Sequence, residues 1–131
     1  MILVDTSVWI DFFGSSNAKH VKKLVSLIES KENICINGLI LAEVLQGIRH
    51  DEQYKKVKSY FNSLVFLPMH YDVYEKSASI YRFLRAKGIT VRKPIDCMIA
   101  SSAIFHEATL LHNDKDFLPI GKYCHLSEIK E

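Results

Sequence analysis

Acidic side chains occupy five positions that could together bind a cation: Asp5, Glu43, Asp96, Asp114 and Asp116. Asp5 ends an apolar run, and a charge buried at the end of a strand is costly unless another group pairs with it. Carboxylates that are brought together raise one another's pKa, so a cluster of them usually binds a cation. Ligands that are all oxygen atoms favour Mg²⁺ or Mn²⁺ over zinc or copper. The acidic residues therefore predict a site for a hard divalent cation.

Each acid also has an ordinary structural explanation. Asp5 could cap a helix that follows it, Asp96 could complement a helix dipole, and Asp114 could form a turn. Glu43 could be a solvated helix residue, and for Glu43 and Asp116 taken alone the ordinary explanation is the stronger one. The choice therefore depends on whether the surrounding strands and helices bring the five acids together.

Apolar runs predict short strands that alternate with amphipathic helices. We expect strands at residues 1 to 5, 34 to 36, 109 to 112 and 123 to 126, and a brief extended segment at 65 to 68. We expect helices from residue 8 after a Thr6 or Ser7 cap, at 17 to 32, 39 to 50, about 54 to 64, about 73 to 84 with an end by Gly88, and 94 to 107. This alternation predicts an α/β fold in one domain, residues 1 to 131, with a short, mainly parallel central sheet covered by helices on both faces.

The carboxyl ends of parallel strands meet at one edge of the sheet, where ligands usually bind. Asp5 ends the first predicted strand, and Asp114 follows a later strand after a single residue. Asp96 falls in the first turn of its predicted helix, and Glu43 lies off the apolar stripe of its own. We therefore expect the acids to face the same edge, although they are distant in the sequence.

Four short motifs follow one another along the chain: VDTSVWID at residues 4 to 11, LAEVLQG at 41 to 47, KPIDCMIASSA at 93 to 103 and NDKDF at 113 to 117. In this order and at these intervals, in a chain of 131 residues, they are strongly specific. Across its whole length the chain resembles the PIN-domain nucleases, and within them the VapC-type toxins of bacterial and archaeal toxin–antitoxin pairs. The resemblance implies a single PIN-like domain.

The resemblance also implies a role for each matching residue. Asp5, Glu43, Asp96 and Asp114 would be the catalytic, metal-binding acids, with Asp116 as a further metal ligand. Thr6, Ser7 and Asn113 would support them through hydrogen bonds. The sequence departs from the family at His112-Asn113, where many relatives have a hydroxyl residue shortly before the aspartate. This departure concerns the role of Asn113 and not the metal site.

The predicted reaction is endonucleolytic hydrolysis of an RNA phosphodiester by a water that Mg²⁺ or Mn²⁺ activates. Such an ion lowers the pKa of a bound water, orients the phosphate and offsets the charge that develops on its oxygens. None of the six histidines belongs to an obvious acid–base pair, which disfavours a metal-free attack by the ribose 2′-hydroxyl. The sequence has three cysteines but no C-x-x-C and no H-x-x-x-H, which argues against a zinc centre.

A basic stretch precedes Asp96. Residues 76 to 95 contain six basic side chains and no acidic one, although the net charge of the chain is only +2. If the five acids are withdrawn into a metal site, the rest of the chain has 17 basic and 10 acidic residues. We predict that Arg82, Arg85, Arg92 and Lys93 bind the RNA backbone. The alternative is a solvated helix face.

The resemblance implies a small VapB-type antitoxin as partner and a homodimer. Trp9, Phe12 and Phe13 follow Asp5 closely, and we predict that they line a groove for an amphipathic antitoxin helix, with the core as the alternative for at least one of them. No apolar run approaches the ~20 residues that span a bilayer, and no basic segment precedes a hydrophobic stretch at the amino terminus. We therefore expect neither membrane insertion nor secretion, and the expected location is the cytoplasm.

Other functions compete with this interpretation. A phosphatase of the haloacid dehalogenase type requires D-x-D where this chain has Asp5-Thr6-Ser7, and a phospho-receiver domain requires adjacent acids near its first strand. A catalytically silent RNA-binding module would be signalled by the loss of an acid, and the acids are all present. The alternative within the nucleases is a housekeeping RNA-processing enzyme, which often carries extra domains.

Overall fold

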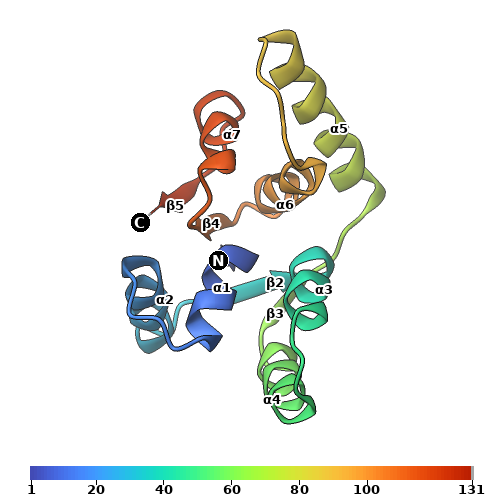
Figure 1. The fold of residues 1–131 in the computed structure, drawn as a ribbon. Helices are drawn as coiled ribbons and strands as arrows, with labels where there is room; N and C mark the ends of the chain where they lie inside the picture. Colours follow the sequence, from blue (N-terminus) through green and yellow to red (C-terminus); the bar gives the residue numbers. More distant parts are fainter. Residues whose placement is uncertain (131) are drawn as a thin grey trace.

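A five-stranded parallel sheet forms the centre of the computed structural model, which describes residues 1 to 130 (Figure 1). Its strands are β1 (Ile2–Val4), β2 (Ile34–Asn37), β3 (Val65–Leu67), β4 (Thr109–His112) and β5 (Glu128–Lys130). Their order across the sheet is β3-β2-β1-β4-β5, and each neighbouring pair runs parallel. The structure therefore confirms the predicted α/β fold.

Helices surround this sheet. Those within residues 1 to 130 are α1 (Thr6–Phe13), α2 (Lys19–Glu29), α3 (Gly38–Gln46), α4 (Asp51–Asn62), α5 (Tyr71–Ala86), α6 (Pro94–Phe105) and α7 (Leu118–Tyr123), with a 3₁₀ turn at Lys115–Phe117. In Figure 1, α2 lies on one side of the strands, and α5 and α6 lie on the other. None of the helices between residues 1 and 130 has both the length and the apolar character needed to span a membrane.

The inner strands carry the hydrophobic core. Leu3 on β1, Cys35 on β2, and Leu110 and Leu111 on β4 are fully buried. Parallel strands that are covered on both faces have near-continuous apolar sequences, because side chains of both orientations are removed from water. This burial is worth roughly 25 cal/mol for each Å² of apolar surface.

The register of the sheet brings the ends of β1 and β4 together. Val4 pairs with Leu111, and the backbone N–H of Asp5 extends the ladder by donating to the Leu111 carbonyl at 2.9 Å. Asp5 and the segment that carries Asp114 therefore leave the sheet at the same edge, as the sequence predicts.

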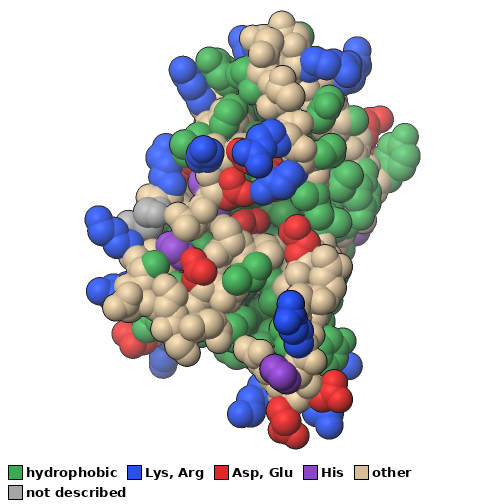
Figure 2. Space-filling model, in the orientation of Figure 1, with side chains coloured by type: hydrophobic (Ala, Val, Ile, Leu, Met, Phe, Trp, Pro, Cys, Tyr) green, Lys and Arg blue, Asp and Glu red, His purple; other side chains and the backbone are tan. Residues whose placement is uncertain are grey.

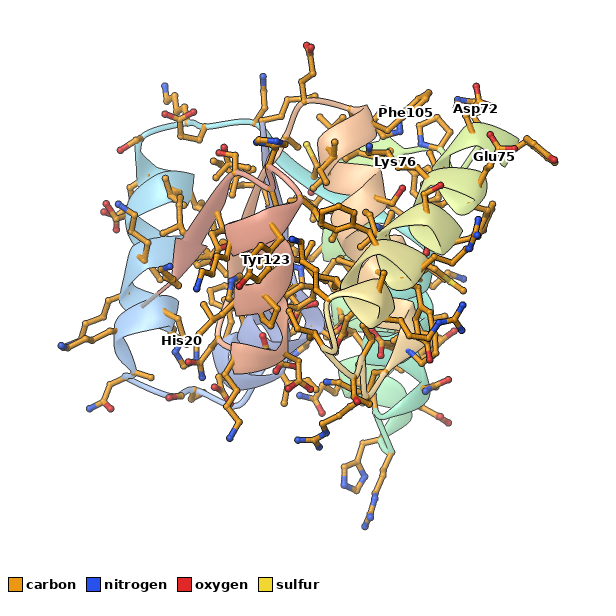
Figure 3. The ribbon with its side chains drawn as sticks, turned by 90° about the horizontal axis from the view of Figure 1, so that it is seen from above. His20, Asp72, Glu75, Lys76, Phe105 and Tyr123 are labelled. Carbon is orange, nitrogen blue, oxygen red and sulfur yellow. The ribbon has the colours of Figure 1, made fainter. Side chains whose placement is uncertain are left out.

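Helices α5 and α6 form an antiparallel pair beside the sheet. In Figure 3, Phe105 at the end of α6 lies near Asp72 at the start of α5. The hydroxyl of Ser101 on α6 joins the two helices by donating to the carbonyl of Val73 at 2.6 Å. The first turn of α6, which carries Asp96, therefore lies at the opposite end of the pair.

Two predictions of local structure are wrong. Helix α1 begins at Thr6 and not at residue 8, and its cap is neither Thr6 nor Ser7, because the Asp5 side chain accepts the Ser7 N–H at 3.0 Å. The last strand lies at Glu128–Lys130 and not at residues 123 to 126, because α7 ends at Tyr123 and the chain then turns through His125, whose φ is 59°. The other predicted helices agree with the structure to within four residues at each end.

Candidate metal centre

Three carboxylates meet at the sheet edge where β1 and β4 end. Asp96, Asp114 and Asp116 each offer an oxygen atom, and these oxygens lie within 4.8 Å of one another. Asp96 comes from the first turn of α6, whereas Asp114 and Asp116 come from the segment that follows β4. Figure 2 shows acidic side chains near the middle of the molecule, with Lys and Arg side chains beside them.

Asp114 is fixed by its neighbours. It caps the 3₁₀ turn, because its Oδ1 accepts the Asp116 N–H at 2.9 Å, and its own N–H donates to Nδ1 of His112 at 3.2 Å. Burial by itself would raise the pKa of Asp114, but hydrogen bonds from Lys93 and from the Asp116 N–H, together with the charge of Lys93, lower the pKa. Asp114 is therefore ionised at neutral pH, as a metal ligand must be.

Asp96 presents a buried oxygen that the described part of the chain leaves without a hydrogen-bond partner. The residue is only 4% exposed, and the unpartnered atom is Oδ2. Burial raises the pKa of Asp96 to about 7; the charge of Lys93 opposes this rise, while the charges of Asp114 and Asp5 add to it. A buried carboxylate oxygen is stabilised when a cation coordinates it. The donor set therefore fits a hard divalent ion.

Asp5 lies outside this group of three but close to it. It is 4% exposed, and its Oδ2 accepts the Ser7 N–H at 3.0 Å and the Ser7 hydroxyl at 2.6 Å. Burial raises the pKa of Asp5, and these two hydrogen bonds oppose the rise. The charge of Asp5 in turn contributes to the raised pKa of Asp96.

Glu43 is the acid on α3, and it also lies outside the group of three. Its Oε1 accepts the hydroxyl of Thr6 at 2.8 Å. The two hydroxyl residues after Asp5 thus bind different acids, Thr6 binding Glu43 and Ser7 binding Asp5. Asn113 takes part through its backbone N–H, which donates to the Ser7 hydroxyl oxygen at 3.1 Å.

Lys93 occupies a place that the sequence did not predict. Its Nζ lies 2.6 Å from Oδ2 of Asp114, 3.5 Å from Oδ2 of Asp96 and 3.8 Å from Oδ2 of Asp116. The hydrogen bond to Asp114 raises the pKa of Lys93, although partial burial opposes the rise. A residue that we predicted to bind RNA thus has its ammonium group among the three carboxylates.

Of the other three predicted RNA-binding residues, one lies beside this cluster and two lie on α5. Arg92 is at its rim, with Nε 3.9 Å from Oδ2 of Asp116, whereas Arg82 and Arg85 are exposed on α5. A hollow of about 550 Å³ extends from Asp116 between the end of α5 and α7. Its basic lining residues are Arg92, Lys115 and Lys122.

Behind Asp114 lies a buried polar pair, His112 and Glu128, which was not predicted from the sequence. Nδ1 of His112 accepts the Asp114 N–H, so Nε2 carries the ring proton and donates to Oε1 of Glu128 on β5 at 3.1 Å. Gly121 leaves room for this carboxylate, because a Cβ on Gly121 would lie 1.4 Å from Oε2 of Glu128. The pair joins two neighbouring strands, and a local sequence pattern carries no signal for it.

The aromatic residues after Asp5 belong to a cluster that also contains Tyr60 and Phe61. Trp9 is fully buried in this cluster, so the prediction that it lines a partner groove is wrong. Phe12 and Phe13 are only partly buried, and both border a hollow of about 570 Å³ that Tyr60 also lines. Along α1, therefore, Trp9 lies in the core, whereas Phe12 and Phe13 reach the surface.

Comparisons with known proteins identify the family. The PIN domain family matches residues 2–123 of the chain. Over 130 residues the chain is 36% identical to VapC ribonuclease Mb1587 of Mycobacterium bovis and to ribonuclease VapC11 of Mycobacterium tuberculosis, with 96% of both chains covered in each case. The chain therefore belongs to the PIN-domain family, and within it to the VapC proteins.

Solved structures confirm the fold. VapBC2 from Rickettsia felis, bound to a DNA fragment from its promoter, has a TM-score of 0.79 at 20% identity. The match covers 100% of this chain and 99% of the Rickettsia felis chain. DNA-bound VapBC from Salmonella typhimurium has a TM-score of 0.78 at 19% identity, with 98% and 96% covered. Mycobacterium tuberculosis VapC20, described as a toxin that cleaves the sarcin-ricin loop, has a TM-score of 0.69 at 16% identity, with 92% and 95% covered.

Proposed function

We propose that this chain is the ribonuclease toxin of a VapBC-type toxin–antitoxin pair, and that it hydrolyses RNA with a water activated by Mg²⁺ or Mn²⁺. The observation that carries the proposal is the group of three carboxylates in which Asp96 has a buried, unpartnered oxygen. The names of the relatives at 36% identity support the same activity. A divalent ion bound here would lower the pKa of its water, orient the scissile phosphate and offset the charge on the phosphate oxygens.

The residues of the chain supply the geometry for this reaction. Asp96, Asp114 and Asp116 offer the oxygens that would hold the ion, and Asp5 adds a fourth carboxylate whose charge already reaches Asp96. Glu43, which Thr6 holds by a hydrogen bond, would add negative charge on the α3 side of the site. With Asp5 and Glu43 added to the group of three, the negative charge would exceed that of one divalent ion, which is consistent with a second ion or with basic residues that complete the balance.

The RNA would approach along the basic hollow that starts at the acidic cluster. Arg92 lies between the cluster and this hollow, so its guanidinium can bind a phosphate next to the one that is cleaved. Lys115 and Lys122 continue the positive charge along the hollow, and the ammonium groups of Lys122 and Lys87 lie over the ring of Tyr123 in its lining. Figure 3 shows Tyr123 on α7, well apart from Asp72 at the start of α5. Arg82 and Arg85 on α5 would then bind phosphates farther along the strand.

The antitoxin would bind at the partly buried aromatics of α1. Phe12 and Phe13 border an open hollow, and Ile10 on the same helix is 57% exposed, which is unusual for so apolar a side chain. An amphipathic helix of a VapB-type antitoxin fits such a surface. We also propose that the protein is a cytoplasmic homodimer.

RNA cleavage by the purified chain tests the activity. Cleavage should occur with Mg²⁺ or Mn²⁺ and stop in EDTA, because the carboxylates need the ion to bind a phosphate. Asp114→Asn should abolish cleavage while changing little volume, whereas Asp72→Asn, which alters an exposed acid on α5, should cleave like the wild type. Cleavage that persists in EDTA contradicts the proposal.

Co-expression tests the partner. The product of the adjacent reading frame should relieve toxicity and co-purify as a complex without nuclease activity. Phe12→Asp should weaken that complex, whereas Phe105→Asp, which alters an exposed aromatic on α6, should leave it intact. If expression of an active ribonuclease is harmless and the neighbouring product does not co-purify, the toxin assignment fails and a housekeeping nuclease replaces it.

A further inference from the structure

The ammonium group of Lys93 lies where the three carboxylates converge. It is within 4.0 Å of an oxygen from each of Asp96, Asp114 and Asp116, and its contact with Asp114 is a hydrogen bond of 2.6 Å. Lys115, which stands between Asp114 and Asp116 in the sequence, makes no ion pair with any residue from 1 to 130. Proximity in the sequence therefore does not explain the position of the Lys93 side chain.

The backbone position of Lys93 lets its side chain enter and leave this cluster. Lys93 is the residue before α6, its backbone is extended, and its side chain is 47% exposed. A lysine side chain has four rotatable methylene groups, so the ammonium group can move to solvent while α6 and its first turn stay in place. The carboxylates themselves are fixed, since Asp114 caps the 3₁₀ turn and Asp96 is buried.

The atoms that bind this ammonium are the atoms that a metal ion would use. All three Lys93 contacts are with Oδ2 atoms, and one of them is the Asp96 Oδ2 that has no hydrogen-bond partner among the described residues. The distance of 3.5 Å to that oxygen is an ion pair without a hydrogen bond, so the ammonium satisfies Asp96 only in part. A divalent ion on these same oxygen atoms would displace the ammonium group, because two cations that contact the same atoms repel each other.

We propose that Lys93 is an internal counter-ion of the metal centre, which holds the three carboxylates together until a divalent ion takes its place and then turns outward to the RNA phosphate. This inference rests on the proposed metal dependence of the nuclease. Lys93 is thus a positioning residue for the acids. It also lowers the affinity of the site for the ion, because the ion must displace a hydrogen bond between charged groups. Lys93 would then bind RNA, as predicted from the sequence, only when the metal ion is bound.

Direct measurement of Mn²⁺ binding, without RNA, tests the competition. Free Mn²⁺ measured by electron paramagnetic resonance should show about tenfold tighter binding to Lys93→Met than to the wild type, since a charge-assisted hydrogen bond no longer competes. Lys58→Met removes the same charge from an exposed position on α4, away from the acidic cluster, and its affinity should stay within about twofold of the wild type. Unchanged or weaker Mn²⁺ binding by Lys93→Met overturns the proposal.

Amine acylation of the unaltered protein provides a second measurement that does not depend on a variant that folds. Mass spectrometry should show that saturating Mg²⁺ increases acylation of Lys93 several-fold, because the ion releases the amine from the carboxylates, while acylation of Lys115 changes little. Equal or reduced acylation of Lys93 with Mg²⁺ contradicts the exchange. Both measurements omit RNA, so a failure of the nuclease assignment and a failure of this exchange are distinguishable.

Discussion

The hydroxyl of Ser7 joins the end of β1 to Asn113 after β4. It donates to Oδ2 of Asp5 at 2.6 Å and accepts the backbone N–H of Asn113 at 3.1 Å. One short side chain thus fixes a carboxylate from one end of the sequence against the loop that carries Asp114. The carboxyl ends of the two strands are held in register by this contact as well as by the sheet.

Replacement of Ser7 tests the importance of this contact. Ser7→Ala removes a hydrogen bond to a buried carboxylate and leaves the Asn113 N–H without its acceptor, so we expect a loss of about 2 kcal/mol in the free energy of unfolding. Ser7→Thr keeps the hydroxyl and should lose much less. Urea denaturation in EDTA measures both, and equal stabilities of the wild type and Ser7→Ala would show that the contact contributes nothing.

The raised pKa of Asp96 predicts how stability depends on pH. The pKa rises from an ordinary value of 3.8 to about 7 on folding, so between these values the folded chain keeps a proton that the unfolded chain loses. The contribution of Asp96 to stability therefore falls as the pH rises from about 4 to about 7. Without metal, Asp96→Asn should be more stable than the wild type at pH 8 and equally stable at pH 3.

The matched variant at Asp114 should behave in the opposite way. Its pKa is lowered in the folded chain, so the ionised side chain contributes stability at neutral pH that is lost as the pH falls through that lowered pKa. Asp114→Asn should therefore be less stable than the wild type at pH 8 without metal. Thermal unfolding in EDTA at several pH values compares the two, and the same sign for both variants would contradict this account of the charges.

The His112–Glu128 pair predicts a coupling between Gly121 and Glu128. Gly121→Ala would force the Glu128 carboxylate away, because the new Cβ would lie 1.4 Å from Oε2, and the hydrogen bond to His112 would be lost. We expect a cost of about 1 to 2 kcal/mol in the wild type. In a Glu128→Ala background the same change should cost far less. A double-mutant cycle by urea denaturation measures the difference, and additive effects would exclude the coupling.

Arg92 should contribute to RNA affinity through charge. Arg92→Gln should weaken binding of single-stranded RNA and reduce the slope of log affinity against log salt by about 0.7, the value for one lost phosphate contact. Lys58→Gln alters an exposed lysine on α4, away from the acidic cluster, and should leave the slope unchanged. Equal slopes for Arg92→Gln and the wild type would show that Arg92 is a solvated surface residue that does not contact the RNA.

The sequence predicts the positions of Asp5 and Asp114 because each follows an apolar strand, and parallel strands end at a common edge. It does not predict the place of Lys93, whose side chain reaches an acid 21 residues away. The strand at Glu128–Lys130 is short and polar, so its pairing with β4 decides its conformation and the apolar pattern does not reveal it. Trp9 and Phe12 are aromatic residues of the same helix, so the sequence does not show which of them is buried. Trp9 packs against both Tyr60 and Phe61, whereas Phe12 contacts Tyr60 and reaches the surface.

The chemistry of the product ends tests most directly whether the carboxylate cluster performs metal-dependent hydrolysis of RNA. RNA cleaved by the wild type in Mn²⁺ should carry 5′-phosphate and 3′-hydroxyl ends, because a water activated by the bound ion would attack the phosphorus and the 3′-oxygen would leave and take up a proton. Asp96→Asn, purified and assayed in the same way, should yield none of these products. Ends with 2′,3′-cyclic phosphate, or equal cleavage by Asp96→Asn, would contradict the account.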